Sequence, residues 1–254
     1  MRTLLSMFVV LFSISLMAQT SGSPGATKPA ATAKKPAVAS IAPTAIIETN
    51  MGNMTCTLFR DKAPIAVANF VGLARGTKDW TDPKTGKKMH GVPLYNGTIF
   101  HRVIPEFMIQ GGDPAGTGSG EIGFSIKDEL RPDLLYDRPG RLAYANAGPN
   151  TSASQFFITE MPQPGLNPCF DDGGCQRGYR TVPKGTGYTI FGQCDDATVE
   201  LVKTIARIPR DANDRPEKTV TISKITILHA GGASTHAPAH TTRTKPVPQG
   251  TKQQ

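Results

Sequence analysis

The sequence has almost no tryptophan, little histidine and no long apolar segment beyond its first residues. Among 254 residues there are five histidines and a single tryptophan, Trp80. A membrane-spanning helix needs about 20 consecutive apolar residues, and after the N-terminus no segment provides them. The lack of further apolar segments excludes a membrane protein with several spans.

Residues 1–18 are predicted to be a signal peptide. Arg2 supplies a positive charge, and residues 4–17 form an apolar stretch that is short for a membrane span. No cysteine follows this stretch, which argues against a lipid anchor. Cleavage is expected after Ala18, although Leu16 is larger than usual at its position; an uncleaved N-terminal anchor is the alternative. We therefore expect an exported protein, periplasmic or secreted, with no stable membrane insertion after cleavage.

The two ends of the chain differ in composition from its middle. Residues 19–44 and 231–254 are rich in Ala, Thr, Pro and Lys, and they have too little apolar content to offset the entropy of ordering. We expect a disordered linker and a disordered basic tail around one domain, residues 45–230. The net charge of +8 comes from these ends, because the domain holds 21 basic and 20 acidic residues. A nearly neutral domain gives no electrostatic basis for binding nucleic acid.

The pattern of the domain predicts many short strands and only two helices. The clearest elements are a hairpin over residues 45–59 with its turn at 50–53, helices over 64–75 and 197–205, and a last strand over 219–228. Alternation in that strand changes phase between Lys224 and Ile225, which indicates a bulge. Many strands with two helices favour a closed antiparallel barrel.

Three separated motifs resemble the cyclophilin family of peptidyl-prolyl cis-trans isomerases. Residues 100–113 read FHRVIPEFMIQGGD, residues 145–151 read ANAGPNT and lead into SQFF, and residues 189–192 read TIFG. The resemblance covers most of residues 45–230. It implies a mainly β fold, a closed eight-stranded antiparallel barrel capped by two α-helices, with a substrate groove on its outer face.

The chemistry of this reaction requires no nucleophile, metal or cofactor, and we expect none. Rotation about an X-Pro bond meets a barrier of ~18–20 kcal/mol because amide resonance resists twisting. In the twisted amide the proline nitrogen regains a lone pair, so a donor aimed at it stabilises the transition state selectively. The resemblance places the family's catalytic arginine at Arg102, whose guanidinium offers a rigid fork of donors.

The resemblance also implies the other site residues. The catalytic set is Arg102, Gln110 and Phe107, and the substrate-binding set is Met108, Ala145, Asn146, Ala147, Gln155, Phe157, Leu166 and Tyr188. Without the motifs, the large apolar members would be interpreted as core residues. With them, we expect an apolar pocket for the proline ring, amide side chains that hold the peptide, and a stretch that pairs with substrate backbone.

The sequence departs from the family's pattern at one wall of this pocket. Gly165 stands at the usual tryptophan position and Tyr188 at the usual histidine position, and an insertion of roughly eighteen residues, 168–185, separates Leu166 from Tyr188. Trp80 lies in another extended loop, 77–90. We expect a less enclosed ring pocket, with part of its wall supplied by the insertion.

The four cysteines leave two questions open. Cys169 and Cys175 flank a short loop and are expected to form a disulfide, with a metal site that uses Asp171 and Asp172 as the alternative. Cys56 and Cys194 lie in strand-like surroundings. They are expected either to remain buried thiols or to form a second disulfide.

The sequence therefore predicts an exported, monomeric prolyl isomerase that assists the folding of exported proteins. Its partners would be proline-containing unfolded or flexible polypeptides. The alternative is a cyclophilin-fold peptide-binding module or chaperone with little isomerase activity. The altered pocket wall supports that alternative. The enzyme is favoured by four retained residues, Arg102, Phe107, Gln110 and Phe157.

Overall fold

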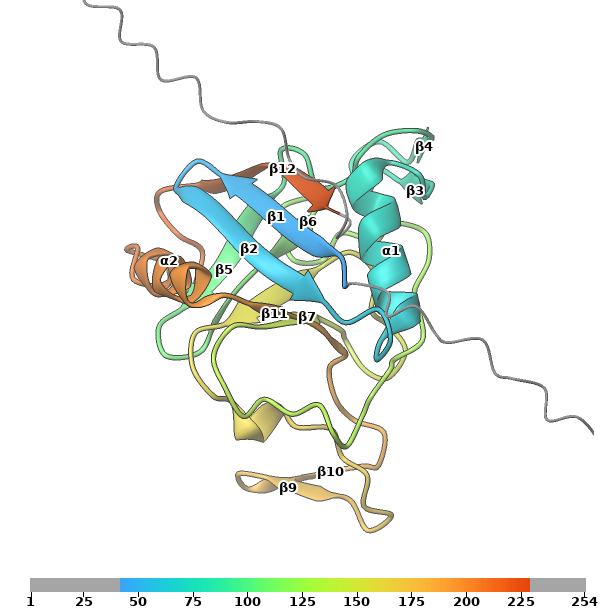
Figure 1. Ribbon diagram of the computed structural model, residues 1–254, viewed down its shortest axis with the longest axis vertical. Coiled ribbons are helices and arrows are strands. Elements are labelled where there is room, and N and C mark those ends of the chain that lie inside the picture. The colour runs from blue at the N-terminus through green and yellow to red at the C-terminus, as the bar shows by residue number, and fades with distance from the viewer. Residues whose placement is uncertain (1–41, 229–254) are drawn as a thin grey trace, which may run out of the picture. The chain divides into compact units, whose positions relative to one another are not determined.

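Eight antiparallel strands close into a barrel, which confirms the fold class (Figure 1). In order around the barrel the strands are β1 (Thr44–Thr49), β12 (Val220–Leu228), β5 (Ile99–Ile104), β6 (Met108–Asp113), β8 (Phe156–Thr159), β7 (Arg141–Tyr144), β11 (Ile190–Cys194) and β2 (Gly52–Leu58). This computed structural model describes residues 42–228. The predicted signal peptide, the C-terminal tail and nearly all of the predicted linker lie outside the described residues.

The predicted hairpin is formed by β1 and β2, with a shorter turn than expected. Gly52 and Asn53 already pair with β1, so only two residues remain in the turn. Gly52 has φ +135°, a conformation that residues with a Cβ rarely adopt. This freedom lets β2 begin two residues earlier than the sequence suggested.

The phase shift in the last strand is a β-bulge, as predicted. Ser223 and Lys224 are both exposed, between the buried Ile222 and Ile225. The register with β1 shifts at the same place, between Glu48 and Thr49. The bulge keeps the isoleucines on both sides of it directed into the core.

The two helices cover opposite ends of the barrel (Figure 1). Helix α1 (Pro64–Arg75) ends at Gly76, which has the left-handed conformation expected of a C-terminal cap. Helix α2 (Asp196–Ala206) begins after Asp195, whose side chain accepts a hydrogen bond from the Thr198 amide at 2.8 Å. Apolar residues of both helices belong to the core cluster that fills the barrel. Among residues 42–228 neither helix is long and apolar enough to cross a membrane.

Two small hairpins and one short helix lie outside the barrel. Strands β3 (Trp80–Thr81) and β4 (Lys88–Met89) pair within the extended 77–90 loop, and β9 (Cys175–Arg177) and β10 (Arg180–Val182) pair within the insertion. A 3-10 helix, η1 (Pro164–Leu166), precedes the insertion. Figure 1 shows the β9–β10 hairpin projecting from the barrel.

All four cysteines form disulfides. Cys169 pairs with Cys175, as expected. Among residues 42–228, no group of three or more His, Cys, Asp or Glu side chains is placed to hold a metal ion. Cys56 pairs with Cys194, which resolves the question left open by the sequence. These two residues face each other on β2 and β11, so the bond joins strands that are 138 residues apart in sequence.

Candidate active site

Two of the three predicted catalytic residues, Arg102 and Gln110, lie in one row across the outer face of the barrel, and the third, Phe107, lies in the turn before β6. Arg102 on β5 pairs with Gln110 on β6, which pairs with Phe157 on β8, which pairs with Ala143 on β7. Side chains alternate between the two faces of a strand, and the neighbours of these residues, such as Ile109, belong to the barrel core. Strand register therefore brings together residues that are up to 55 positions apart in sequence.

An apolar cluster, separate from the barrel core, forms the centre of this outer face. Its buried members are Met108, Leu134, Tyr136, Ala143, Phe157 and Ile190, and the partly buried residues Phe59, Ile104, Phe107, Ala145, Leu166 and Tyr188 pack against them. We call these residues the outer cluster. The Phe157 ring stacks on Tyr136 at 6.0 Å and meets the edge of Tyr188 at 5.7 Å. Sequence reasoning missed Tyr136 and Leu134, because an outer-face apolar residue outside a known motif has no distinguishing pattern.

Two glutamines connect this face to a neighbouring loop. The side-chain amide of Gln110 donates to the side-chain oxygen of Gln155 at 3.0 Å, and the side-chain amide of Gln155 donates to the backbone carbonyl of Gly118 at 2.9 Å. The Ala145 amide donates to the Gln155 carbonyl at 2.9 Å. These bonds fix both glutamine side chains beside the row that carries Arg102.

The loop that receives these bonds is organised by one buried carboxylate. Asp113 is fully buried and accepts hydrogen bonds from four backbone amides, those of Ala115, Thr117, Gly118 and Gly120. Burial raises the pKa of the Asp113 carboxyl, but the four amides together outweigh burial and hold the pKa below its usual value. Asp113 therefore stays ionised and sets the conformation of the 113–120 loop.

A groove of about 730 Å³ opens beside the outer cluster. It contains five of the predicted site residues, Gln110, Ala145, Asn146, Ala147 and Gln155, together with the 118–125 segment. The Asn146 side chain is held in place because its side-chain amide donates to the Gly187 carbonyl at 2.8 Å. The predicted backbone-pairing stretch thus forms one wall of the groove.

Arg102 lies at the edge of the site, and its side chain is half exposed. Its Nε lies 3.5 Å from a carboxylate oxygen of Asp214, and 42% of its side chain is exposed. Asp214 belongs to the 207–219 loop between α2 and β12. No sequence pattern selects this aspartate, because more than 100 residues separate it from the motif.

The turn that carries Phe107 is clamped by a buried glutamate. Glu160 accepts a hydrogen bond from the Glu106 amide at 2.9 Å and from Arg207 at 2.8 Å, and its own amide donates to the Phe107 carbonyl at 2.9 Å. Glu160 is 4% exposed. The clamp fixes a turn in which Glu106 has φ +60°, and with it the position of Phe107.

The insertion does not replace the missing wall as the sequence suggested. A Cβ on Gly165 would meet no atom within 4 Å, so this edge of the outer cluster is open. Within the described residues, no apolar side chain of 168–185 belongs to the outer cluster. The reason is geometric: residues 175–182 pair with each other as the β9–β10 hairpin, and Arg177 anchors it through the Asn167 carbonyl at 2.7 Å. Trp80 does not supply this wall either, because its side chain packs against the main core cluster and not the outer cluster.

Comparison with known proteins agrees with this geometry. Residues 44–227 match the family model described as cyclophilin type peptidyl-prolyl cis-trans isomerase/CLD. Peptidyl-prolyl cis-trans isomerase A of Mycobacterium tuberculosis (strain ATCC 25618 / H37Rv) is 45% identical over 185 residues, which cover 72% of this chain and 91% of that protein. Peptidyl-prolyl cis-trans isomerase B of Streptomyces anulatus is 41% identical over 186 residues, covering 72% and 95%.

A solved structure has the same fold. The crystal structure of a cyclophilin type isomerase of Cryptosporidium parvum aligns with a TM-score of 0.57 at 33% identity, covering 74% of this chain and 98% of that one. A second structure of that protein, in the presence of the dipeptide Ala-Pro, aligns with a TM-score of 0.56 at 35% identity, covering 73% of this chain and 98% of that one. The chain therefore belongs to the cyclophilin family of peptidyl-prolyl cis-trans isomerases.

Proposed function

We propose that this isomerase rotates X-Pro bonds on the outer face of the barrel, with Arg102 as the donor to the proline nitrogen. The observation that carries the proposal is the row formed by Arg102, Gln110 and Phe157 beside the outer cluster. A half-exposed guanidinium at the edge of an apolar surface can reach the amide of a proline whose ring packs on that surface.

The substrate is a proline-containing, flexible polypeptide. The proline ring packs against the partly buried members of the outer cluster, Phe107, Leu166 and Tyr188. The residues before proline run along Asn146 and Ala147 in the 730 Å³ groove. The related Cryptosporidium parvum protein crystallised in the presence of Ala-Pro, and this supports the same class of ligand. Backbone pairing is independent of side-chain sequence, which suits a general folding catalyst.

The same proposal places the enzyme outside the cytoplasm. Two disulfides support it, because disulfides persist mainly in oxidising compartments. The apolar stretch over residues 4–17 after Arg2 supports it independently. Mass spectrometry of protein from its native cell should find a mature start near Gln19. A full-length cytosolic species would refute export.

Turnover of an Ala-Pro peptide in a protease-coupled assay tests the catalytic role. The full chain should accelerate isomerisation, and Arg102→Ala should lower kcat by about 10²–10³, the loss typical of a transition-state hydrogen bond. Arg131→Ala is a matched control, because Arg131 is an exposed arginine that also pairs with an aspartate, Asp133 at 2.8 Å. Equal kcat for Arg102→Ala and the control would refute the assignment.

A further inference from the structure

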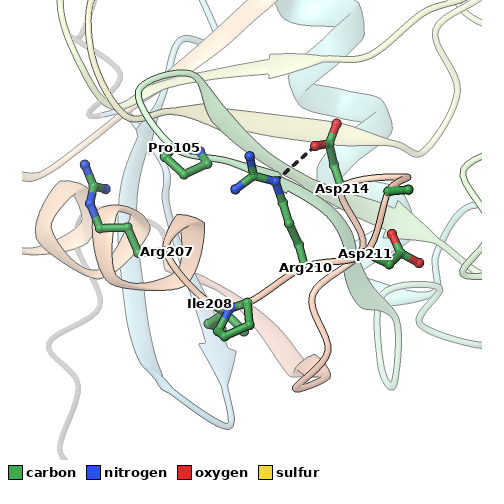
Figure 2. Close-up of a pocket in the computed structure, with 8 residues that line it drawn as sticks. Pro105, Arg207, Ile208, Arg210, Asp211 and Asp214 are labelled. Atoms are coloured by element: carbon green, nitrogen blue, oxygen red, sulfur yellow. Dashed lines mark hydrogen bonds and ion pairs between the residues drawn. The ribbon is translucent and has the colours of Figure 1, made fainter.

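Asp214 lies between two arginines, one of which is the proposed catalytic donor. One carboxylate oxygen is 3.5 Å from Nε of Arg102, and the other accepts a hydrogen bond from Nε of Arg210 at 3.1 Å. Figure 2 shows the second of these interactions, in a groove of about 600 Å³ that Asp214 and Arg210 line together with Pro105. The three side chains together carry a net charge of +1.

The backbone of Asp214 is fixed against the strand that carries Arg102. Its carbonyl accepts a hydrogen bond from the amide of Val103 at 2.8 Å, and its amide donates to the Asp211 carbonyl at 3.1 Å. Asp214 has φ +61°, in the left-handed region. The Asp211 carboxylate in turn accepts from the amides of Asn213 and Arg215 at 2.8 and 2.9 Å. The carboxylate of Asp214 therefore has a defined position relative to β5.

A donor that must meet a twisted amide benefits from such a partner. A long, half-exposed arginine side chain has many rotamers, and fixing it costs side-chain entropy. A carboxylate at Nε restricts the plane of the guanidinium while leaving both terminal nitrogens free to donate. Arg210 shares the carboxylate, so the negative charge of Asp214 is divided between two cations and Arg102 keeps its attraction for a developing lone pair.

We propose that Asp214 is a positioning residue, which orients the guanidinium of Arg102 for catalysis and is itself held by Arg210 and by the 207–219 loop. The proposal rests on the proposed function of Arg102. It predicts that the charge of Asp214 affects turnover rather than peptide affinity, because Asp214 lies outside the outer cluster and the 730 Å³ groove.

Asp214→Asn in the full chain is the primary test. Asparagine tolerates the left-handed conformation, so the backbone is kept while the charge is lost. We expect kcat for an Ala-Pro peptide to fall by about tenfold, in line with the cost of small misplacements of a catalytic group, with an unchanged peptide Kd and melting temperature. Asp133→Asn is the matched control, since Asp133 also lies between two cations, Lys62 and Arg131.

A second variant and a spectroscopic signal separate positioning from a merely structural role. Asp214→Gly also permits positive φ and removes the carboxylate, so it should reproduce the fall in kcat. In NMR spectra, the Nε–H resonance of Arg102 should shift in both Asp214 variants and stay unchanged in Asp133→Asn.

The outcomes distinguish this proposal from the one on which it rests. If Arg102→Ala loses activity while Asp214→Asn matches or exceeds the wild type, the positioning role is refuted and the donor role stands. A fall in Asp214→Gly alone would assign Asp214 a purely backbone role and would also refute the proposal. An inactive wild type would refute the function itself.

Discussion

The face of the sheet, rather than residue type, separates the site from the core. Phe156 and Phe157 are adjacent in sequence and nearly equally buried, yet Phe156 belongs to the barrel core and Phe157 to the outer cluster. Strand alternation makes this difference. A substitution at each position should therefore have a different effect, on stability in the first case and on binding in the second.

Phe157→Leu tests this difference. The substitution keeps an apolar side chain but removes the ring faces that contact Tyr136 and Tyr188. We expect KM for an Ala-Pro peptide to rise several-fold with kcat nearly unchanged, because in the proposed mechanism the outer cluster binds the ring in both the ground state and the transition state. Phe156→Leu, in the core, is the matched control and should lower stability without this change in KM. A fall in kcat at constant KM for Phe157→Leu would contradict the assignment.

His101 should make stability depend on pH. Burial lowers the pKa of its imidazole below the usual value; nearby Asp113 raises it less, and Arg215 and Arg102 lower it further. Protons therefore bind the unfolded state more readily. The contribution of the neutral His101 side chain to the free energy of unfolding is fully present above the unfolded pKa of about 6.5. It is lost as pH falls from there toward the lower pKa of the folded state.

Urea denaturation at pH 7.5 and 5.5 measures this effect. The free energy of unfolding of the wild type should fall over this interval, by at most about 1.4 kcal/mol per pH unit from this group. His101→Gln should show a shallower dependence, whatever its stability at pH 7.5. Equal slopes in the two proteins would show that His101 does not titrate in this way.

At the scale of elements, the loop beside the groove depends on Asp113. Asp113→Asn loses the charge to which four backbone amides donate. Because hydrogen bonds to charged groups contribute roughly 1.5–3 kcal/mol, we expect a stability loss of at least that size. Peptide Kd should also rise, since the Gly118 carbonyl that holds Gln155 lies in this loop. Asp82→Asn, in the exposed β3–β4 turn, removes a carboxylate that accepts from one backbone amide, so it should cost less stability and leave peptide Kd unchanged. Unchanged peptide affinity in Asp113→Asn would disconnect the loop from the groove.

We expect the Cys169–Cys175 disulfide to have a local role. It closes a loop of few residues, so the entropic stabilisation is small, roughly 2–3 kcal/mol at most. The hairpin is joined to the site through Arg177 and Asn167, next to Leu166 of the outer cluster. We expect the double variant Cys169→Ser, Cys175→Ser to change the peptide Kd while its melting temperature changes only slightly. A large loss of melting temperature with unchanged affinity would reverse this interpretation.

The sequence predicted the elements that local patterns encode and missed those that only the fold creates. Helix α1 spans residues 64–75 as predicted, and α2 begins within one residue of its predicted start. The position of Asp214 beside Arg102 could not be predicted, because it depends on a loop that returns from the far end of the chain. The prediction that the insertion supplies part of the pocket wall was wrong, because residues of the insertion pair with each other as the β9–β10 hairpin.

At the scale of the whole molecule, closure of the barrel holds the site together. The proposed active face uses β5, β6, β8 and β7, and closure joins this group through β11 to β2 and through β12 to β1. Because Cys56–Cys194 links β2 to β11, the disulfide reinforces the closed structure.

Loss of this disulfide should lower global stability. The bond spans 138 residues, and removing a native disulfide typically costs roughly 2–5 kcal/mol. We expect this loss in Cys56→Ala, Cys194→Ala by chemical denaturation, with kcat nearly unchanged below the melting transition. Comparison with reduced wild type separates the loss of the cross-link from the loss of sulfur packing. An unchanged free energy of unfolding in both would contradict the prediction.

The central claim is that Arg102 acts in the transition state of a reaction on the outer face. The most direct test is the rate of cis-trans exchange of an enzyme-bound Ala-Pro peptide, measured by NMR at saturating wild type and Arg102→Ala. The account predicts an exchange rate about 10²–10³ lower in the variant, with peptide Kd and fold retained. Equal on-enzyme exchange rates in the two proteins would contradict it.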